Sequence, residues 1–364
     1  MENLHPHSSA GKGEFCQGGP RIARRFTLQG DQPMIRRAVP QDIPAICALL
    51  SAVDPAHPKA DAQVLRWQYW SGPFGPPASV VADDPVDGVV GHAGLFAVPC
   101  NLAGRRVVVG HGADAAVAPT HRRRGLFSAL AAARLEAAGQ VGYPTMLAWP
   151  NPRSRQIDRI VGAAAEIRVA VYVAPQLWPS RGLRGMPGSP GHARHPHGPT
   201  VVAECAAPPS GLGDLAALTS GRAHAIIRDD TWWRWRYAER PAAAYRYYAA
   251  SRGERLVAVA VTTVQRVGGR RVTAVMELLA ADLTAARQTV AAVRRSMPTA
   301  ALAVLAVPGT PAAACARACG LLPVPRLLEP APLVLSIAAL PDPALGARAA
   351  AEHWYVSWGD HDHL

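Results

Sequence analysis

The order of apolar and polar positions is clearest in one stretch of the first half, where it predicts a strand, a turn and a helix in close succession. Residues 107–117 are rich in Val and Ala and predict a strand. Residues 118–121 predict a short turn. A helix is expected to begin at Arg122 and to run through Ala138, because Gly139 is suited to end a helix.

The segments around this unit also alternate between strand and helix patterns. A short strand at residues 34–38 precedes a helix with apolar positions from Ile43 to Leu50, which Asp42 is placed to cap. The other expected elements of this half are a hairpin, a strand, a short helix and a last strand: residues 79–82 with 88–98, 145–149, 155–161 and 168–173.

The same order of elements returns in the second half of the chain. Trp235 and Tyr237 stand in an aromatic segment much as Trp67 and Tyr69 do in the first half. Three strands, a helix, a strand and a helix are expected after it: residues 245–251, 256–266, 271–279, 283–297, 300–307 and 311–320. We infer an internal duplication with about 150 residues in each copy.

Composition divides the chain into four parts. Residues 1–33 are polar, Gly-rich and without periodicity, so we expect a disordered N-terminal extension. Residues 177–200 are rich in Pro, Gly and His and predict a linker. The two copies then occupy residues 34–176 and 201–364.

Composition and charge narrow the class of protein. The 364 residues are 49% apolar and 18% charged, which is typical of a globular protein. No apolar run approaches the roughly 18 residues of a membrane span, and the start lacks the apolar core of a signal peptide. We therefore expect a cytoplasmic protein that does not bind a membrane.

The net charge of +12 is carried almost entirely by arginine, since Lys occurs only at Lys12 and Lys59. The arginines are scattered rather than gathered with aromatics on one face, so nucleic-acid binding is not expected. The six cysteines match no zinc or disulfide spacing, so no metal is expected either.

The junction between the strand at 107–117 and the following helix has the properties of an anion site. The first turn of a helix leaves about four backbone N–H groups without partners, at the positive end of the helix dipole. Gly125 has no Cβ, so a phosphate can approach the backbone. Arg122, Arg123 and Arg124 add positive charge and forked donors. The alternative is an ordinary strand-to-helix turn with a solvated basic face.

This junction resembles motif A of the GNAT-family N-acyltransferases, whose helix begins Gln/Arg-x-x-Gly-x-Gly/Ala. Arg122, Gly125 and Phe127 fall on the three defining positions, and Phe127 departs from Gly/Ala. Val117 and Pro119 also stand where family members often carry Val and Pro. The resemblance implies that acetyl-CoA or a longer acyl-CoA binds here, at Ala116, Val117, Ala118, Arg122, Arg123, Arg124, Gly125, Leu126 and Phe127.

The duplication resembles the tandem-GNAT subfamily. It implies an α+β fold of two tandem GNAT-like domains, each with a mixed, mostly antiparallel central sheet flanked by helices. The second copy lacks motif A: its matching strand leads into Ala280, Ala281 and Asp282 without Arg or Gly. Because Asp282 would repel phosphate, we assign the coenzyme to the first copy only.

The family resemblance also suggests catalytic residues. Several family members carry a carboxylate base six residues before the position matched here by Val117, and that position is His111. A histidine is a competent base near pH 7. A core or substrate-binding histidine is the alternative, and Asp114 is the second candidate for the base.

Two other segments have open roles. The resemblance places Asn151 and Ser154 near the thiol end of the coenzyme, although both residues are equally suited to cap the short helix that follows. At the C-terminus, Asp360 or Asp362 could meet a cationic acceptor, or the segment could be a strand with a solvated polar end.

The sequence thus predicts an N-acyltransferase that moves an acetyl or longer acyl group from acyl-CoA to a primary amine. The expected acceptor is a small molecule, such as an amino sugar, an amino acid derivative or an intermediate of specialised metabolism. A non-catalytic acyl-CoA sensor and a protein N-acetyltransferase are the alternatives. The expected assembly is a monomer or a homodimer.

Overall fold

The structure is a computed structural model that describes residues 33–361, apart from Ala56, Pro58, Ala103, Gly162, 177–198, 221–223, Pro330 and 340–353. The predicted extension at 1–33 lies outside the described residues except for Pro33, and most of the predicted linker and Asp362 lie outside them too. No described helix is long and apolar enough to cross a lipid bilayer.

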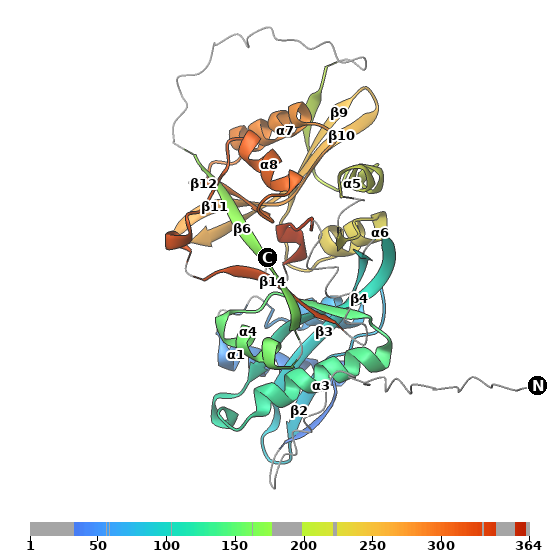
Figure 1. Ribbon diagram of the computed structural model, residues 1–364, viewed down its shortest axis with the longest axis vertical. Helices are drawn as coiled ribbons and strands as arrows, with labels where there is room; N and C mark the ends of the chain where they lie inside the picture. The colour runs from blue at the N-terminus through green and yellow to red at the C-terminus, as the bar shows by residue number, and fades with distance from the viewer. Residues whose placement is uncertain are drawn as a thin grey trace, which may run out of the picture.

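The first half of the chain supplies β1–β6 and α1–α4 (Figure 1). The strands are β1 (Met34–Arg37), β2 (Val80–Asp84), β3 (Gly88–Leu102), β4 (Arg105–Val117), β5 (Thr145–Ala148) and β6 (Ala163–Pro175). The helices are α1 (Ile43–Val53), α2 (Ala62–Leu65), α3 (Leu126–Val141) and α4 (Pro152–Val161).

The second half repeats this order, with the short strands β8 and β13 added. Its strands are β7 (Val201–Cys205), β8 (Ala225–Ile226), β9 (Arg246–Arg252), β10 (Arg255–Val267), β11 (Arg270–Ala280), β12 (Ala301–Ala306), β13 (Leu322–Pro323) and β14 (Leu333–Ala339). Its helices are α5 (Leu212–Ser220), α6 (Asp230–Trp233), α7 (Leu283–Ser296) and α8 (Pro311–Ala318).

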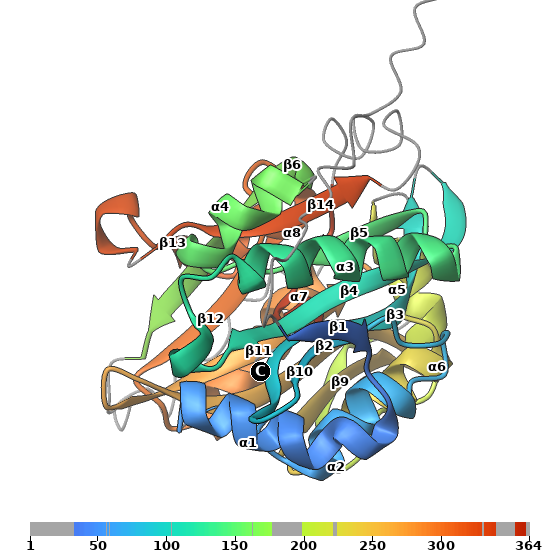
Figure 2. The ribbon, with the colours of Figure 1, turned by 90° about the horizontal axis from the view of Figure 1, so that it is seen from below.

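One sheet runs through both halves, in the order β1-β2-β3-β4-β5-β14-β6-β12-β11-β10-β9-β7. β6 joins the halves, because its first part pairs with β14 and its second part pairs with β12. β14 comes from near the end of the chain but lies between β5 and β6 (Figure 2). The copy at 34–176 therefore completes its sheet with a strand from the range 201–364.

Helices cover both faces of the sheet in the first half. α3 packs on β2, β3 and β4, while α1 contacts β3 and β4 from the other side (Figure 2). The alternation of β3 explains the two layers. Leu95 and Ala97 join the core under α3, whereas Phe96 and Val98 face α1 and the second half.

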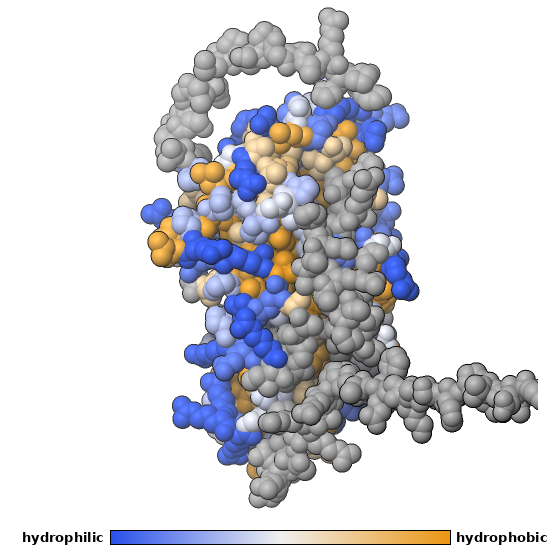
Figure 3. Space-filling view, in the orientation of Figure 1, coloured by the Kyte–Doolittle hydropathy of each residue, from blue (hydrophilic) through white to orange (hydrophobic). Residues whose placement is uncertain are grey.

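The second half is built in the same way. α7 packs on β9, β10 and β11, and α5 contacts β10 and β11. The outer face seen in Figure 3 mixes hydrophilic with apolar residues, as expected for a surface that cannot be covered by polar atoms alone.

The predicted duplication is most evident where the halves meet. Trp67 and Trp235 lie in matching π-helical turns, Arg66–Trp70 and Arg234–Ala238. Their rings stack with centroids 4.8 Å apart. Each indole N–H also donates to the backbone carbonyl of the other tryptophan, at 2.9 and 3.4 Å. The predicted α+β class and the tandem arrangement are confirmed.

Local predictions needed three corrections. The helix predicted from Arg122 begins at Leu126 and ends at Val141, so Gly139 lies inside it and Gly142 ends it. Asp42 does not cap α1 with its side chain; its carboxylate accepts from Arg36 instead, at 2.8 Å. The strand predicted at 168–173 is the longer β6, because both of its edges are paired.

Candidate active site

The turn before α3 keeps its backbone N–H groups open. Gly125 is the N-cap residue and has φ of +77°, in the left-handed region that favours glycine. No described side chain caps this helix, and a Cβ added at Gly125 would meet nothing within 4 Å. The predicted arginine turn therefore does lead into an uncapped helix N-terminus.

The three arginines surround this open end. Arg122, Arg123 and Arg124 are all exposed and lie in the turn rather than in the helix. The Arg122 side chain is anchored at one atom, since its Nε donates to the Val117 carbonyl at 3.2 Å.

The apolar residues of this junction are mostly buried. Leu126 is buried under the first turn of the helix, whereas Phe127 is half-buried. Ala116 and Val117 are buried in β4, and Ala118 donates its N–H to the Val90 carbonyl at 2.8 Å.

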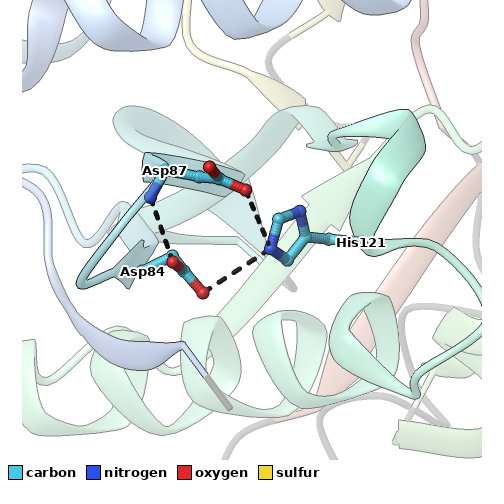
Figure 4. A group of neighbouring side chains, drawn as sticks. All are labelled: Asp84, Asp87 and His121. Atoms are coloured by element: carbon cyan, nitrogen blue, oxygen red, sulfur yellow. Dashed lines mark hydrogen bonds and ion pairs between the residues drawn. The ribbon is translucent and has the colours of Figure 1, made fainter. Parts of the chain in front are cut away.

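A histidine ties this turn to the neighbouring hairpin. His121 is buried, and its Nε2 lies 3.5 Å from Asp84 Oδ2 and 3.7 Å from Asp87 Oδ2 (Figure 4). Asp84 Oδ1 accepts the backbone N–H groups of Val86 and Asp87, and these bonds lower the pKa of Asp84. The β2–β3 turn and the arginine turn are therefore held side by side by ionisable groups.

The strands next to this turn pair over a short stretch only. β4 and β5 run parallel and pair from Gly110 with Met146 to Gly112 with Ala148. Beyond that point β4 pairs with β3 only. A β-bulge comes next, because Asp114 and Ala115 stand opposite the single residue Ala93 of β3.

Asp114 sits in this bulge and faces the interior. Its φ of +50° lies in the left-handed region, which is uncommon for a residue other than glycine. Its carboxylate lies 2.8 Å from Lys59 Nζ and accepts from the Tyr69 hydroxyl at 2.6 Å. The Asp114 and Lys59 side chains are both fully buried. Asp114 is thus part of a buried ion pair.

His111 lies on β4 shortly before the bulge and faces the second half. Its ring stacks on Phe96, with centroids 4.7 Å apart, and is almost fully buried. Its Nε2 lies 3.1 Å from the backbone carbonyl oxygen of Asp360. Because a carbonyl only accepts, Nε2 carries a proton in this contact.

The C-terminal segment forms a wall of the site. A 3₁₀ turn, Trp358–Asp360, presents the Asp360 carbonyl to both His111 and Trp149, whose indole N–H donates at 2.9 Å. The Asp360 carboxylate points elsewhere, to Arg228 at 2.7 and 2.8 Å. The Asp360 carboxylate is therefore already paired with a buried guanidinium, and a cationic acceptor would have to compete with Arg228 for it.

A narrow crevice reaches His111 between the two halves. Its lining combines aromatic and charged side chains, which include Trp67, Trp235, His111, Arg236, Arg240 and Asp360. Its volume is only ≈ 20 Å³, about the space of one water molecule. An acceptor can enter only if the walls move.

Asn151 and Ser154 cap α4. Asn151 Oδ1 accepts the N–H groups of Arg153 and Ser154, both at 3.0 Å, and the Ser154 hydroxyl donates to the Asn151 carbonyl at 3.2 Å. The capping role is therefore present, and any contact of these residues with a coenzyme is additional to it.

Sequence reasoning missed a second buried ion pair that matches the first. In the second half, Arg228 Nε lies 3.0 Å from Glu277 Oε2, and the Tyr237 hydroxyl donates to Glu277 at 3.2 Å. Glu277 comes two positions after the last paired residue of β11, Val275, just as Asp114 comes two positions after Gly112. Lys59 had one visible signal, because a chain that uses arginine almost throughout has a lysine there.

Known proteins resemble this chain in sequence over part of it and in fold over most of it. Residues 34–157 match the family described as the acetyltransferase (GNAT) domain. No curated protein matches the chain.

Solved structures share the fold at low sequence identity. A GCN5-related N-acetyltransferase from Anabaena variabilis is 12% identical, with 84% of this chain and 72% of that chain covered and a TM-score of 0.57. A putative acetyltransferase from Pyrococcus horikoshii is 12% identical, with 97% and 99% covered and a TM-score of 0.53. A tandem GNAT protein from the clavulanic acid biosynthesis pathway is 15% identical, with 84% and 98% covered and a TM-score of 0.51.

The match in the first half coincides with the open helix end and the parted strands described above. The shared fold extends through the second half, where the same strands return without the arginine turn. Residues 34–157 therefore match the GNAT acetyltransferase family, and the chain as a whole shares the fold of tandem GNAT proteins.

Proposed function

We propose that the protein transfers an acetyl or longer acyl group from acyl-CoA to a primary amine of a small molecule, at a single site in the first half. The observation that carries this proposal is the N-terminus of α3, which no described side chain caps and which three exposed arginines surround. The same position in the second half is closed by Asp282.

The residues at this turn fit a pyrophosphate. Gly125 leaves open space at the helix end, where unpaired N–H groups and the helix dipole favour negative charge. Arg123 and Arg124 can supply forked, charge-assisted hydrogen bonds. The coenzyme supplies the activated acyl group when it is bound, and the chain supplies its binding and orientation.

The parted strands fit the acyl end. Beyond Gly112, β4 no longer pairs with β5, so the ladder between these two strands ends there. Backbone N–H groups where two strands part are suited to stabilise the oxyanion that develops when an amine attacks a carbonyl.

We propose His111 as the base. The Asp360 carbonyl accepts from Nε2–H and orients the ring, and in this proposal the ring takes a proton from the attacking amine through Nδ1. The amine nitrogen then forms the new C–N bond, the C–S bond breaks, and the thiolate leaves and recovers a proton. Asp114 fits the role less well, because its carboxylate is held by Lys59 and Tyr69.

The test is a charge reversal at the turn with a matched control in the second half. Arg122→Glu with Gly125→Glu should weaken acetyl-CoA binding at least about 100-fold in calorimetry, since it replaces attraction by repulsion at the phosphates. The control is Arg270→Glu with Gly269→Glu. It makes the same charge change at an exposed turn, and its glycine has φ of +76°.

Equal affinity in the wild type and the Arg122/Gly125 variant would overturn the proposal. Panels of primary amines then distinguish an enzyme from a sensor. Release of free thiol only when an amine is added supports transfer, whereas tight binding with no thiol release under any amine supports a sensor.

A further inference from the structure

The second half contains a cavity that the proposed reaction does not use. It has a volume of ≈ 460 Å³, within the range of small-molecule sites. It lies between β11, β12, α8 and the segment after residue 354. Its walls are mostly apolar and include Val275, Leu278, Val304, Ala312, Cys315 and Tyr355.

The cavity lies where the duplicated strands part. β11 and β12 pair in parallel from Val272 with Ala301 to Val275 with Val304 and then separate. β4 and β5 stop pairing at the matching place in the first half. The second copy has therefore kept the gap between its strands, and α8 forms one side of it.

The charges around this gap exclude a phosphate ligand. Only two residues, Ala281 and Asp282, connect β11 to α7, so the second copy has no basic turn. Asp282 caps the helix by accepting the Ala285 N–H at 2.9 Å, and it is paired with Arg252 at 2.6 Å. The helix end that binds an anion in the first half is occupied here by a carboxylate.

The interior of the cavity also offers little to a charged ligand. The Tyr355 hydroxyl donates to Glu277 at 3.1 Å, and the Ser357 hydroxyl donates to Glu277 at 2.7 Å. Among the described lining residues, Arg255 is the one with a charged side chain, and it is exposed. A charge placed inside would lose its hydration without gaining a partner.

We propose that this cavity binds an uncharged, largely apolar small molecule. The site is separate from the coenzyme turn and does not depend on acyl transfer. Its apolar walls supply the binding free energy through burial of apolar surface. The absence of an opposing charge among the described lining residues sets the preference for a neutral ligand.

One wall of the cavity continues into the active site. Ser357 accepts from Arg228 at 2.9 Å, and Arg228 holds the carboxylate of Asp360. The Asp360 carbonyl in turn contacts His111. A molecule packed against Tyr355 and Ser357 therefore restrains the segment that orients the candidate base.

The experiment uses the full chain and N-phenyl-1-naphthylamine, an uncharged dye that fluoresces in apolar surroundings. We expect saturable binding with one site, competition by decanol, and no competition by acetyl-CoA. Ala312→Trp should weaken dye binding at least about 10-fold, because the indole fills the cavity. The matched control is Ala314→Trp on the exposed side of α8, which should bind the dye like the wild type.

Two further measurements keep the test decisive if Ala312→Trp folds poorly. In the wild type, decanol should slow alkylation of Cys315, which lines the cavity, but not of Cys205, which does not. Decanol should also slow amide hydrogen exchange in the turn Trp358–Asp360.

Absence of dye binding to the wild type, or equal binding by both tryptophan variants, would overturn the proposed site. Full protection of Cys315 without any added ligand would show that the chain itself fills the cavity, and it would overturn the proposal as well. Dye binding with unchanged exchange in the C-terminal turn would overturn the link to the active site.

Discussion

The two halves share a buried acid and differ in the connection from that acid to the next helix. Asp114 with Lys59 and Tyr69, and Glu277 with Arg228 and Tyr237, occupy matching places next to a β-bulge. After the bulge, the first half continues into an exposed arginine turn and an uncapped helix, whereas the second half turns at once into a helix capped by Asp282. The buried acid is therefore common to both copies of the fold, whereas the arginine turn, on which the proposed coenzyme site depends, is a feature of the first half.

The largest effect should come from breaking either ion pair. Lys59→Met and Arg228→Met each remove the cation beside a buried carboxylate, so each should lower the free energy of unfolding by about 3–5 kcal/mol in urea titrations. Arg246→Met is the control, because its pair with Glu204 is exposed and should be worth less than about 1 kcal/mol. If Lys59→Met lowers the free energy of unfolding only slightly while Arg228→Met lowers it strongly, the two ion pairs are not equivalent.

The next effect separates catalysis from structure in the first half. His111→Ala should lower kcat about 100-fold or more if Nδ1 is the base, with acetyl-CoA affinity unchanged. Asp114→Asn should lower stability but keep most of the turnover per folded molecule, since Asp114 faces Lys59. The reverse result would transfer the role of base to Asp114.

A smaller effect is expected at the stacked tryptophans that join the halves. A double-mutant cycle with Trp67→Leu and Trp235→Leu should give a coupling energy of about 0.5–1.5 kcal/mol for the stack, beyond the loss from each single change. Thermal unfolding of the four proteins measures it. Additive losses would show that the two rings merely fill space and do not depend on each other.

The smallest effect concerns β6, the strand that both halves share. The hydrogen bond from Arg155 to Glu166, at 2.7 Å, together with Arg159, lowers the pKa of Glu166 from 4.5 to about 2. A lowered pKa means that this group stabilises the fold above pH 4.5, and that the contribution is lost as the pH falls toward 2. Glu166→Gln should flatten the dependence of stability on pH in this window. If the dependence of stability on pH is unchanged in Glu166→Gln, the pKa of Glu166 does not differ between the folded and the unfolded chain.

Local features were predictable from the sequence, and contacts between distant segments were not. The strand, turn and helix around Gly125 could be predicted from residues close together in the sequence. The correspondence of Trp67 and Trp235 could be predicted from similar short segments in the two halves. The helix begins four residues later than predicted because Arg123 and Gly125 both adopt positive φ. The pattern of apolar and polar residues does not show such a change in backbone conformation. His111 was placed in the site by family resemblance, but its contact with Asp360, 249 residues later, depends on the fold.

The ion pairs and the position of β14 could not be found in the same way. Lys59 and Asp114 are far apart in the sequence, and although the rarity of lysine marks Lys59, nothing near either residue indicates that they pair. β14 has the same apolar composition as any buried strand, so nothing in its residues shows that it belongs to the first half.

The place of β14 has a consequence for how the protein is made. Until residues 333–339 have left the ribosome, β5 and the first part of β6 lack the strand that lies between them. The first half therefore keeps two unpaired strand edges and cannot complete its sheet until almost the whole polypeptide has been translated. A message cut short before residue 333 would yield a fragment with two unpaired strand edges, prone to aggregate, rather than a smaller working enzyme.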